Sequence, residues 1–227
     1  MPKRTKPASR STVYFADAIG VSLDLIDWHV STIKAVASRI EQPRANGKAN
    51  RSDVVQLLGH LWALIDTTHR LRELVQQAPG LKKKSRHIQL FLRRTSRIDV
   101  LRNYVQHLRT EIRSIPTPAP PVWGAVSWVS TQDPHLYFVL FAGAAHPDTS
   151  TFSCSYDMWR GEFVQRFIIS ISGQTVDVEA IAYAVAEVRP LLDEWLTAAS
   201  ASATGPFPIV AVHISGTRPP GGRGTIE

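Results

Sequence analysis

Residues 96–113 have the sequence Ser-Arg-Ile-Asp-Val-Leu-Arg-Asn-Tyr-Val-Gln-His-Leu-Arg-Thr-Glu-Ile-Arg. Ser96 followed by Asp99 has the spacing of a capping box, which commonly opens a helix. Apolar residues then recur three and four apart, which places them on one face of a helix. They are Ile98, Leu101, Val105, Leu108 and Ile112. The stretch therefore predicts a single amphipathic helix that packs against other helices.

The segments before this stretch predict the rest of a helical bundle. Apolar residues at near-helical intervals predict a helix over 13–41 and a second helix from Ser52, as its cap, to about Gln77. A short helix carrying Ile88, Phe91 and Leu92 should follow. Arg94 would fall on the apolar face if that helix continued, so we expect a break before Ser96. Residues 13–115 are thus predicted to form a bundle of about four helices after a disordered basic tail over 1–12.

The sequence after the bundle changes character. Prolines at 116, 118, 120 and 121 end the helical half. Aromatic and β-branched residues then gather in four segments, 122–131, 135–144, 151–157 and 163–172, with a hairpin turn at Asp157–Gly161. A last amphipathic helix should begin near Asp177. The predicted fold class is α+β, in which residues 122–198 form a small antiparallel sheet of three or four strands and a closing helix packed on it. A mostly disordered tail, 199–227, follows.

Charge and cysteine content limit the function classes. The net charge is +7, and between His69 and Arg113 twelve Lys or Arg face three acids. This excess indicates either a polyanionic partner or a solvated helix surface. The one cysteine, Cys154, excludes an intrachain disulfide, and no Cys/His zinc spacing occurs, so we expect no metal or cofactor and a cytoplasmic location. No apolar run of about 18 residues predicts a membrane span.

The polar side of the 96–113 helix carries the string Arg102-Asn103-x-x-x-His107. This string resembles the signature of the HEPN family, compact helical bundles found in many prokaryotic ribonuclease toxins and defence systems. In that family an Arg, often followed by Asn, Asp or His, precedes a His by four to six residues on a late helix. The resemblance covers roughly residues 50–115.

The resemblance implies RNA binding or metal-independent RNA cleavage by a homodimer, with an antitoxin protein as a further partner of a toxin. His107 would transfer protons, since an ordinary imidazole titrates near neutral pH, and Arg102 would stabilise the phosphate. Asn103 would orient the site. The nucleic acid would also contact the basic residues that flank the string, which are Lys82, Lys83, Lys84, Arg97, Arg109 and Arg113.

Other interpretations remain open. Arg102 could pack along the bundle and His107 could be an exposed helix histidine, in a non-enzymatic interaction or scaffold protein or in a nucleic-acid binder without catalysis. Asp66, His69 and Arg70 on the second helix could supply another acid or base, although a solvated helix edge has the same pattern. The aromatic strands could stack on bases, but we expect them to form core. Cys154 is expected to be a small strand residue.

Overall fold

The computed structural model describes residues 10–42, 50–114, 121–141, 154–171 and 173–200. Its helices are α1 (Arg10–Glu41), α2 (Arg51–Gln77), α3 (Arg86–Arg94), α4 (Ile98–Gln106), α5 (Leu108–Ser114) and α6 (Val178–Ser200). Its strands are β1 (Ala125–Val129), β2 (Tyr137–Phe141), β3 (Tyr156–Asp157), β4 (Glu162–Phe163), β5 (Phe167–Ile171) and β6 (Gln174–Asp177). The predicted α+β class is confirmed: helices come first, antiparallel strands follow, and a helix closes the described chain.

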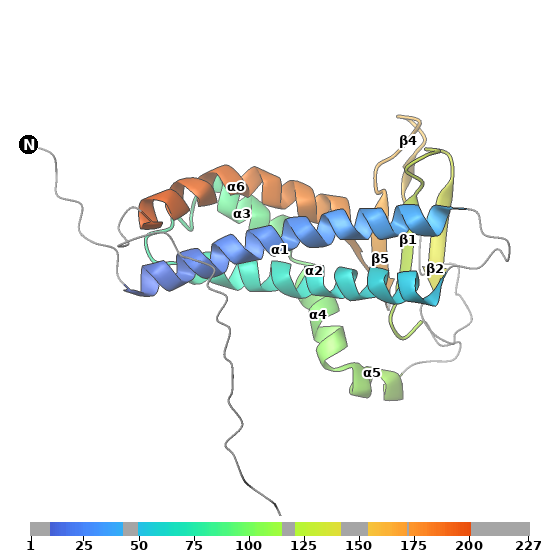
Figure 1. Ribbon diagram of the computed structural model, residues 1–227, viewed down its shortest axis with the longest axis horizontal. Helices are drawn as coiled ribbons and strands as arrows, with labels where there is room; N and C mark the ends of the chain where they lie inside the picture. Colours follow the sequence, from blue (N-terminus) through green and yellow to red (C-terminus); the bar gives the residue numbers. More distant parts are fainter. Residues whose placement is uncertain (1–9, 43–49, 115–120, 142–153, 172, 201–227) are drawn as a thin grey trace, which may run out of the picture.

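The long helices α1 and α2 lie side by side and antiparallel, and α6 runs along them from the sheet (Figure 1). Apolar residues on the facing sides exclude water and supply most of the stabilisation; on α1 and α2 they include Ile19, Ile26, Ile33, Leu57, Leu61 and Leu64. The closing helix packs on α1 and α3 as well as on β5 and β6. One continuous core therefore joins the helical half to the sheet half.

The main sheet has the strand order β2-β1-β5-β6, and all its neighbours are antiparallel. Trp128 on β1 pairs with Phe138 on β2 and with Phe167 on β5, so its indole stacks between the two rings at 5.5 and 5.8 Å. Trp128 and Phe167 are buried, but Trp123, Tyr137 and Tyr156 are 43, 50 and 42% exposed, so the expectation that the aromatic residues form core holds only in part. The turn at Asp157–Gly161 joins β3 to β4 in a separate two-stranded hairpin, and Trp159 at its tip is 99% exposed.

Glu41 at the end of α1 ties the helices to the sheet. Its carboxylate accepts hydrogen bonds from Trp128 Nε1 at 3.0 Å, from Ser130 Oγ at 2.8 Å and from the backbone N–H and hydroxyl of Thr131. A carboxylate at a helix C-terminus opposes the helix dipole. Here several donors compensate for that repulsion, and the last turn of α1 is held against the end of β1.

Several local predictions were wrong. The expected helix over 96–113 is divided at His107 into α4 and α5. Ser96 does not cap α4 as in a capping box, because its hydroxyl donates to the carbonyl of Arg93 instead. Asn50, not Ser52, caps α2, since Asn50 Oδ1 accepts the N–H of Ser52.

In the sheet half, the predicted strand over 163–172 is divided between β4 and β5, and β6 was not predicted. The break between α3 and α4 at residues 95–97 was predicted and is confirmed. Within the predicted tails over 1–12 and 199–227, residues 10–12 and 199–200 are helical, and the others lie outside the described residues. None of the described helices combines the length and the apolarity that a membrane span requires.

Candidate functional site

One side of α4 is anchored in the core. Ile98 and Leu101 are buried, and the Tyr104 hydroxyl donates a 3.3 Å hydrogen bond to the carbonyl of Val122. Helical periodicity turns the remaining polar residues of α4 toward α2 or toward solvent; they are Asp99, Arg102, Asn103 and Gln106. A polar residue of α4 that faces α2 can join a network between the helices, whereas one that faces solvent can contact a ligand.

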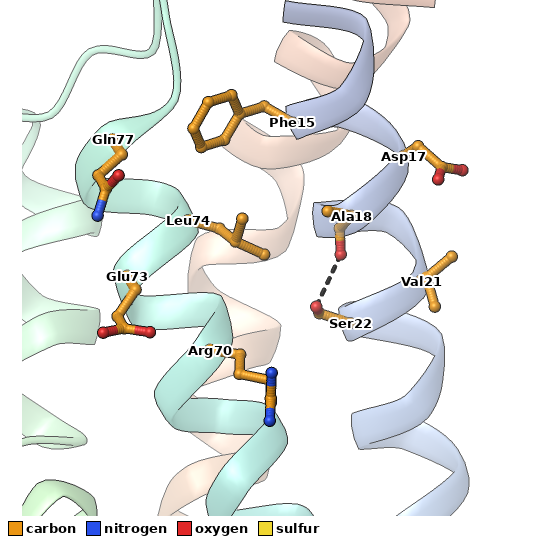
Figure 2. Close-up of a pocket in the computed structure, with 9 residues that line it drawn as sticks. All are labelled: Phe15, Asp17, Ala18, Val21, Ser22, Arg70, Glu73, Leu74 and Gln77. Carbon is orange, nitrogen blue, oxygen red and sulfur yellow. Dashed lines mark hydrogen bonds between the residues drawn. The ribbon is translucent and has the colours of Figure 1, made fainter. Parts of the chain in front are cut away.

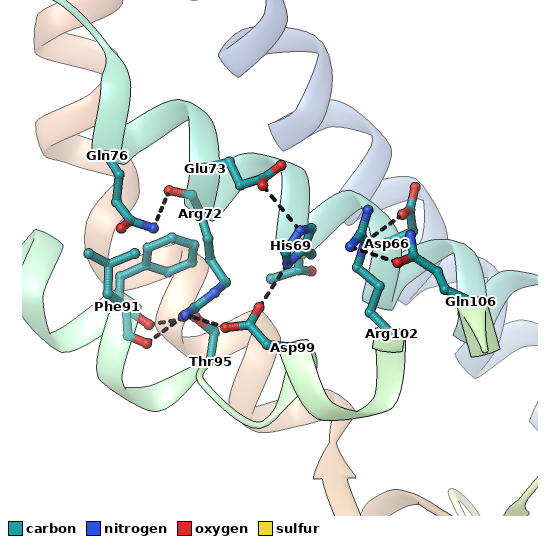
Figure 3. A network of polar contacts seen from close by, with 12 residues as sticks. Asp66, His69, Arg72, Glu73, Gln76, Phe91, Thr95, Asp99, Arg102 and Gln106 are labelled. Atoms are coloured by element: carbon teal, nitrogen blue, oxygen red, sulfur yellow. Dashed lines mark hydrogen bonds and ion pairs between the residues drawn. The ribbon is translucent and has the colours of Figure 1, made fainter. Parts of the chain in front are cut away.

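Asp99 faces α2 and organises the first half of a polar network (Figure 3). Its Oδ1 lies 2.8 Å from His69 Nδ1, and its Oδ2 accepts a 2.9 Å hydrogen bond from Arg72 Nη2. Nη1 of the same buried guanidinium donates to Thr95 Oγ1 at 2.7 Å and to the carbonyl of Leu92. Arg72 thereby connects α2, the end of α3 and the start of α4.

His69 is enclosed by this network. Its Nε2 atom is buried and has no hydrogen-bond partner in the described part of the chain, although Glu73 Oε1 lies 3.4 Å away. A surface cavity of about 490 Å³ adjoins these residues; its lining is His69, Arg72, Glu73, Gln76, Gln77 and Asp99. Because Nε2 is not exposed to solvent and Nδ1 contacts Asp99, His69 serves here to join α2 to α4.

Arg102 belongs to the second half of the network. Its Nε lies 3.4 Å from Asp66 Oδ1, and its Nη1 donates a 3.1 Å hydrogen bond to Gln106. Asp66 also accepts a 2.7 Å hydrogen bond from Arg70 Nε. Burial alone would raise the pKa of Asp66, but the hydrogen bonds and charges of Arg70 and Arg102 outweigh it and lower the pKa. Asp66 therefore stays ionised and holds both guanidinium groups.

His107 occupies the break between α4 and α5. Its backbone, at φ −103° and ψ 18°, leaves the helical region, and its N–H still bonds the carbonyl of Asn103 at 3.0 Å. Its carbonyl accepts the N–H groups of Thr110 and Glu111, which starts the next turn. The imidazole is exposed, as is the Asn103 side chain. Figure 1 shows α4 and α5 projecting from the bundle, so His107 lies on a protruding arm.

The structure thus separates the three residues of the string Arg102-Asn103-x-x-x-His107. Arg102 faces α2, whereas Asn103 and His107 face solvent. Within the described residues, no hydrogen bond or ion pair joins Arg102 to either of the other two. The residues that the structure does bring together come from two helices: Asp66 and His69 from α2, and Asp99 and Arg102 from α4.

The predicted basic residues lie on the surface. Arg97, Arg109 and Arg113 are exposed, as is the lysine run Lys82–Lys84. Arg97 donates a 3.4 Å hydrogen bond to Thr175, and across the described ranges no carboxylate forms an ion pair with any of these six cations. The lysines are separated from Arg97 by the length of α3, about 14 Å for nine residues at 1.5 Å each. Their charges remain available to a polyanion.

Sequence reasoning missed Arg72, which connects the network. The signal was present, since Arg72 continues the buried spacing of Leu61, Ile65 and Thr68 on α2 and is itself 8% exposed. A cation at a core-facing position needs partners nearby, because a buried unpaired charge is costly. That rule could have indicated acceptors on the helix that packs against α2.

The described residues include no group of three or more His, Cys, Asp or Glu side chains placed to hold a metal ion. Cys154 is buried near Ser127, and burial raises the pKa of its thiol. This environment disfavours the nucleophilic thiolate. We found no protein-family model, curated protein or solved structure that matches the chain. The resemblance to the HEPN family accordingly stays a prediction.

Proposed function

We propose that this protein binds RNA through α4, α5 and the break between them, and that it cleaves the bound RNA without a metal ion. The observation that carries the proposal is that the imidazole of His107 is exposed in a segment, 97–113, in which the guanidinium groups of Arg97, Arg109 and Arg113 are exposed as well. An imidazole can exchange protons near neutral pH, and unpaired guanidinium groups attract phosphates. In the proposed setting the protein is a cytoplasmic toxin or defence effector that acts as a homodimer and is opposed by an antitoxin protein.

The proposed chemistry assigns separate tasks to these groups. One imidazole takes the proton of the attacking 2′-hydroxyl, and a second supplies a proton to the departing 5′-oxygen, so that a 2′,3′-cyclic phosphate forms. A homodimer supplies both from two copies of His107. Arg102 stabilises the charge on the phosphorus oxygens. For this it exchanges its contact with Asp66, a long one at 3.4 Å, for a phosphate oxygen.

The second candidate function is that of a scaffold without catalysis. The observation that favours it is the pairing of Arg102 with Asp66 and Gln106, which leaves the guanidinium satisfied within the chain. In that case the network between α2 and α4 only fixes the position of α4 and α5, and the exposed basic residues of α4, α5 and the lysine run bind a partner. The two candidates differ in whether loss of His107 affects RNA products.

The test compares RNA cleavage in EDTA by the wild type, His107→Ala and His87→Ala. His87 is a matched control because it is also exposed, on α3, within the same basic segment. We expect 2′,3′-cyclic phosphate ends from the wild type and from His87→Ala, and at least a hundredfold slower cleavage by His107→Ala. Equal products from all three proteins would remove His107 from the mechanism. No products but salt-dependent binding would favour the scaffold.

A further inference from the structure

A pocket of about 310 Å³ lies where the break between α3 and α4 meets β6 and the first turn of α6. Ile98 and Ile181 supply part of its apolar lining. Its polar lining includes Arg97 from the break, Gln165 from the connection between β4 and β5, and Asp177 at the end of β6. A pocket of this size and mixed lining suits a small organic group that has both polar and apolar parts.

Arg97 brings unused hydrogen-bond donors to this pocket. Its Nη1 donates to Thr175 Oγ1 at 3.4 Å, a long contact that engages one of the five N–H groups of the guanidinium. Within the described residues no carboxylate forms an ion pair with Arg97. Arg94 also lines the pocket, but it is held by an ion pair with Glu187 and lies over the ring of Tyr183. An anionic group in the pocket would therefore bind to Arg97.

Asp177 has one carboxylate oxygen that is not engaged. Its Oδ1 accepts the backbone N–H groups of Glu179 at 2.8 Å and Ala180 at 3.4 Å, and so caps α6. Among the described residues no hydrogen bond or ion pair reaches its Oδ2. Burial raises the pKa of this carboxyl, because the charged form is partly removed from water. A ligand group that donated a hydrogen bond to Oδ2 would stabilise the ionised carboxylate.

The spacing of these groups indicates the chemistry of the ligand. Arg97 contacts β6 at Thr175, and Asp177 lies two residues further along the same face of the strand, about 7 Å away. Gln165 Oε1 accepts a 2.6 Å hydrogen bond from Ser155, which leaves its Nε2 as a second donor to an anion. A ligand that satisfies both ends of the pocket carries an anionic group at one end and a hydrogen-bond donor at the other. A ribonucleotide combines the two, because its phosphate is attached to a ribose that carries a 2′-hydroxyl.

A larger groove, of about 570 Å³ between α1 and α2, lacks this pattern (Figure 2). Phe15 and Leu74 point into the space between the two helices, and the lining includes two carboxylates. Arg70, the cation of that lining, already donates to Asp66 at 2.7 Å. The acidic charge of the groove disfavours a phosphate, so the pocket beside Arg97 is the better site for a nucleotide.

We propose that the pocket holds one ribonucleotide of a bound RNA, with Arg97 on its phosphate and Asp177 on its 2′-hydroxyl. This inference rests on the proposed RNA binding, and it adds the contact by which the protein distinguishes RNA from DNA, since DNA has no 2′-hydroxyl. Arg97 and His107 flank α4, so ten residues of helical rise, about 15 Å, separate them. One strand can therefore contact the pocket and the imidazole a few nucleotides apart.

Fluorescence anisotropy on the full chain tests the contact with the ribose, in a His107→Ala background that keeps the RNA intact. We expect a single-stranded RNA to bind about tenfold more tightly than DNA of the same sequence, which is the effect of one hydrogen bond to a charged acceptor. Asp177→Ser keeps a side-chain oxygen to cap α6 but removes Oδ2, so it should bring the ratio of the two affinities close to one. The ratio is the readout, because loss of a carboxylate charge raises the affinity for both polyanions. Asp177→Asn should lower the ratio in the same direction, and circular dichroism verifies that α6 is intact in both variants.

The phosphate contact is tested in the same assay. Arg97→Gln should weaken the binding of RNA and DNA by the same factor, about fivefold, because both carry phosphates. Arg51→Gln is the matched control, since it removes the same charge at an exposed position at the start of α2, and it should change either affinity by less than about twofold. Equal effects of the two substitutions would overturn the contact assigned to Arg97.

Adenosine 5′-monophosphate separates a nucleotide of RNA from a free nucleotide. We expect it to compete with RNA only at millimolar concentration, because one nucleotide forms few of the phosphate contacts of a strand. Micromolar binding that leaves the RNA bound would assign the pocket to a free nucleotide and overturn the proposal. A ratio of RNA to DNA affinity that neither Asp177 substitution changes would also overturn it, while RNA binding itself would stand. Absence of RNA binding by every protein would refute the proposed function as well.

Discussion

Replacing Arg72 by Met should loosen the attachment of α4 to α2. The methionine keeps an apolar stem of similar length but removes the donors to the Leu92 carbonyl, to Thr95 Oγ1 and to Asp99. Asp99 is 40% exposed and can be hydrated, so most of the cost arises at the two acceptors near Thr95, which is 1% exposed. At about 1–2 kcal/mol for each buried acceptor, the free energy of unfolding should fall by about 3 kcal/mol.

Urea denaturation followed by circular dichroism measures this loss, and the melting temperature should fall by about 6–12 °C for a chain of this size. Arg86→Met is the control, because Arg86 is exposed at the start of α3, and it should change the free energy by less than about 0.5 kcal/mol. If Arg72→Met is equally mild, the guanidinium does not hold the helices together and our account of the network is wrong. A double-mutant cycle with Asp99→Asn then apportions the coupling between the two side chains.

Three further substitutions test other parts of the account. Glu41→Ala leaves the buried indole N–H of β1 without its acceptor and should cost about 3 kcal/mol in urea denaturation, whereas Glu41→Gln should cost less. Burial and the neighbouring His60 lower the pKa of His29 below 6.5. The free energy of unfolding should therefore contain the full contribution of neutral His29 above pH 6.5 and should lose it as the pH falls through the folded-state pKa. His29→Phe should flatten this decline. Asp66→Asn should free Arg102 and tighten RNA binding several-fold in fluorescence anisotropy, and unchanged or weaker binding would contradict the proposed phosphate contact.

Periodicity predicted the helices that pack along their whole length and failed where packing ends. The apolar spacing of 96–113 continues through Leu108 and Ile112, but Tyr104 is the last buried residue, and Ile112 is 47% exposed. Beyond Tyr104 only the partly buried side chains of Val105 and Leu108 pack against the core, and a short helix is marginal without fuller packing. The strand β6 was missed because its sequence, Gln174–Asp177, has a single strongly apolar residue, Val176, and its strand character comes from pairing with β5.

The site was predictable as a set of residues but not as a set of contacts. Asp66, His69 and Arg102 could each be identified from residue type and helix face. In the structure Asp66 pairs with Arg102, and His69 pairs with Asp99. These pairings depend on how α2 and α4 are placed relative to each other, and the spacing of residues within one helix gives no information on that placement. A pairing between helices requires the tertiary fold, so the string on α4 alone suggested a more compact site than the structure has.

Nuclear magnetic resonance of the histidine rings during titration with a short single-stranded RNA tests the central claim most directly. The account predicts that the His107 imidazole signals shift progressively with RNA, and that the shift decreases as salt is added, because phosphate contacts near Arg109 release counterions. The signals of His87 report the behaviour of an exposed histidine elsewhere in the basic segment and should move less. Unchanged His107 signals at an RNA concentration that saturates binding would contradict the proposed interface.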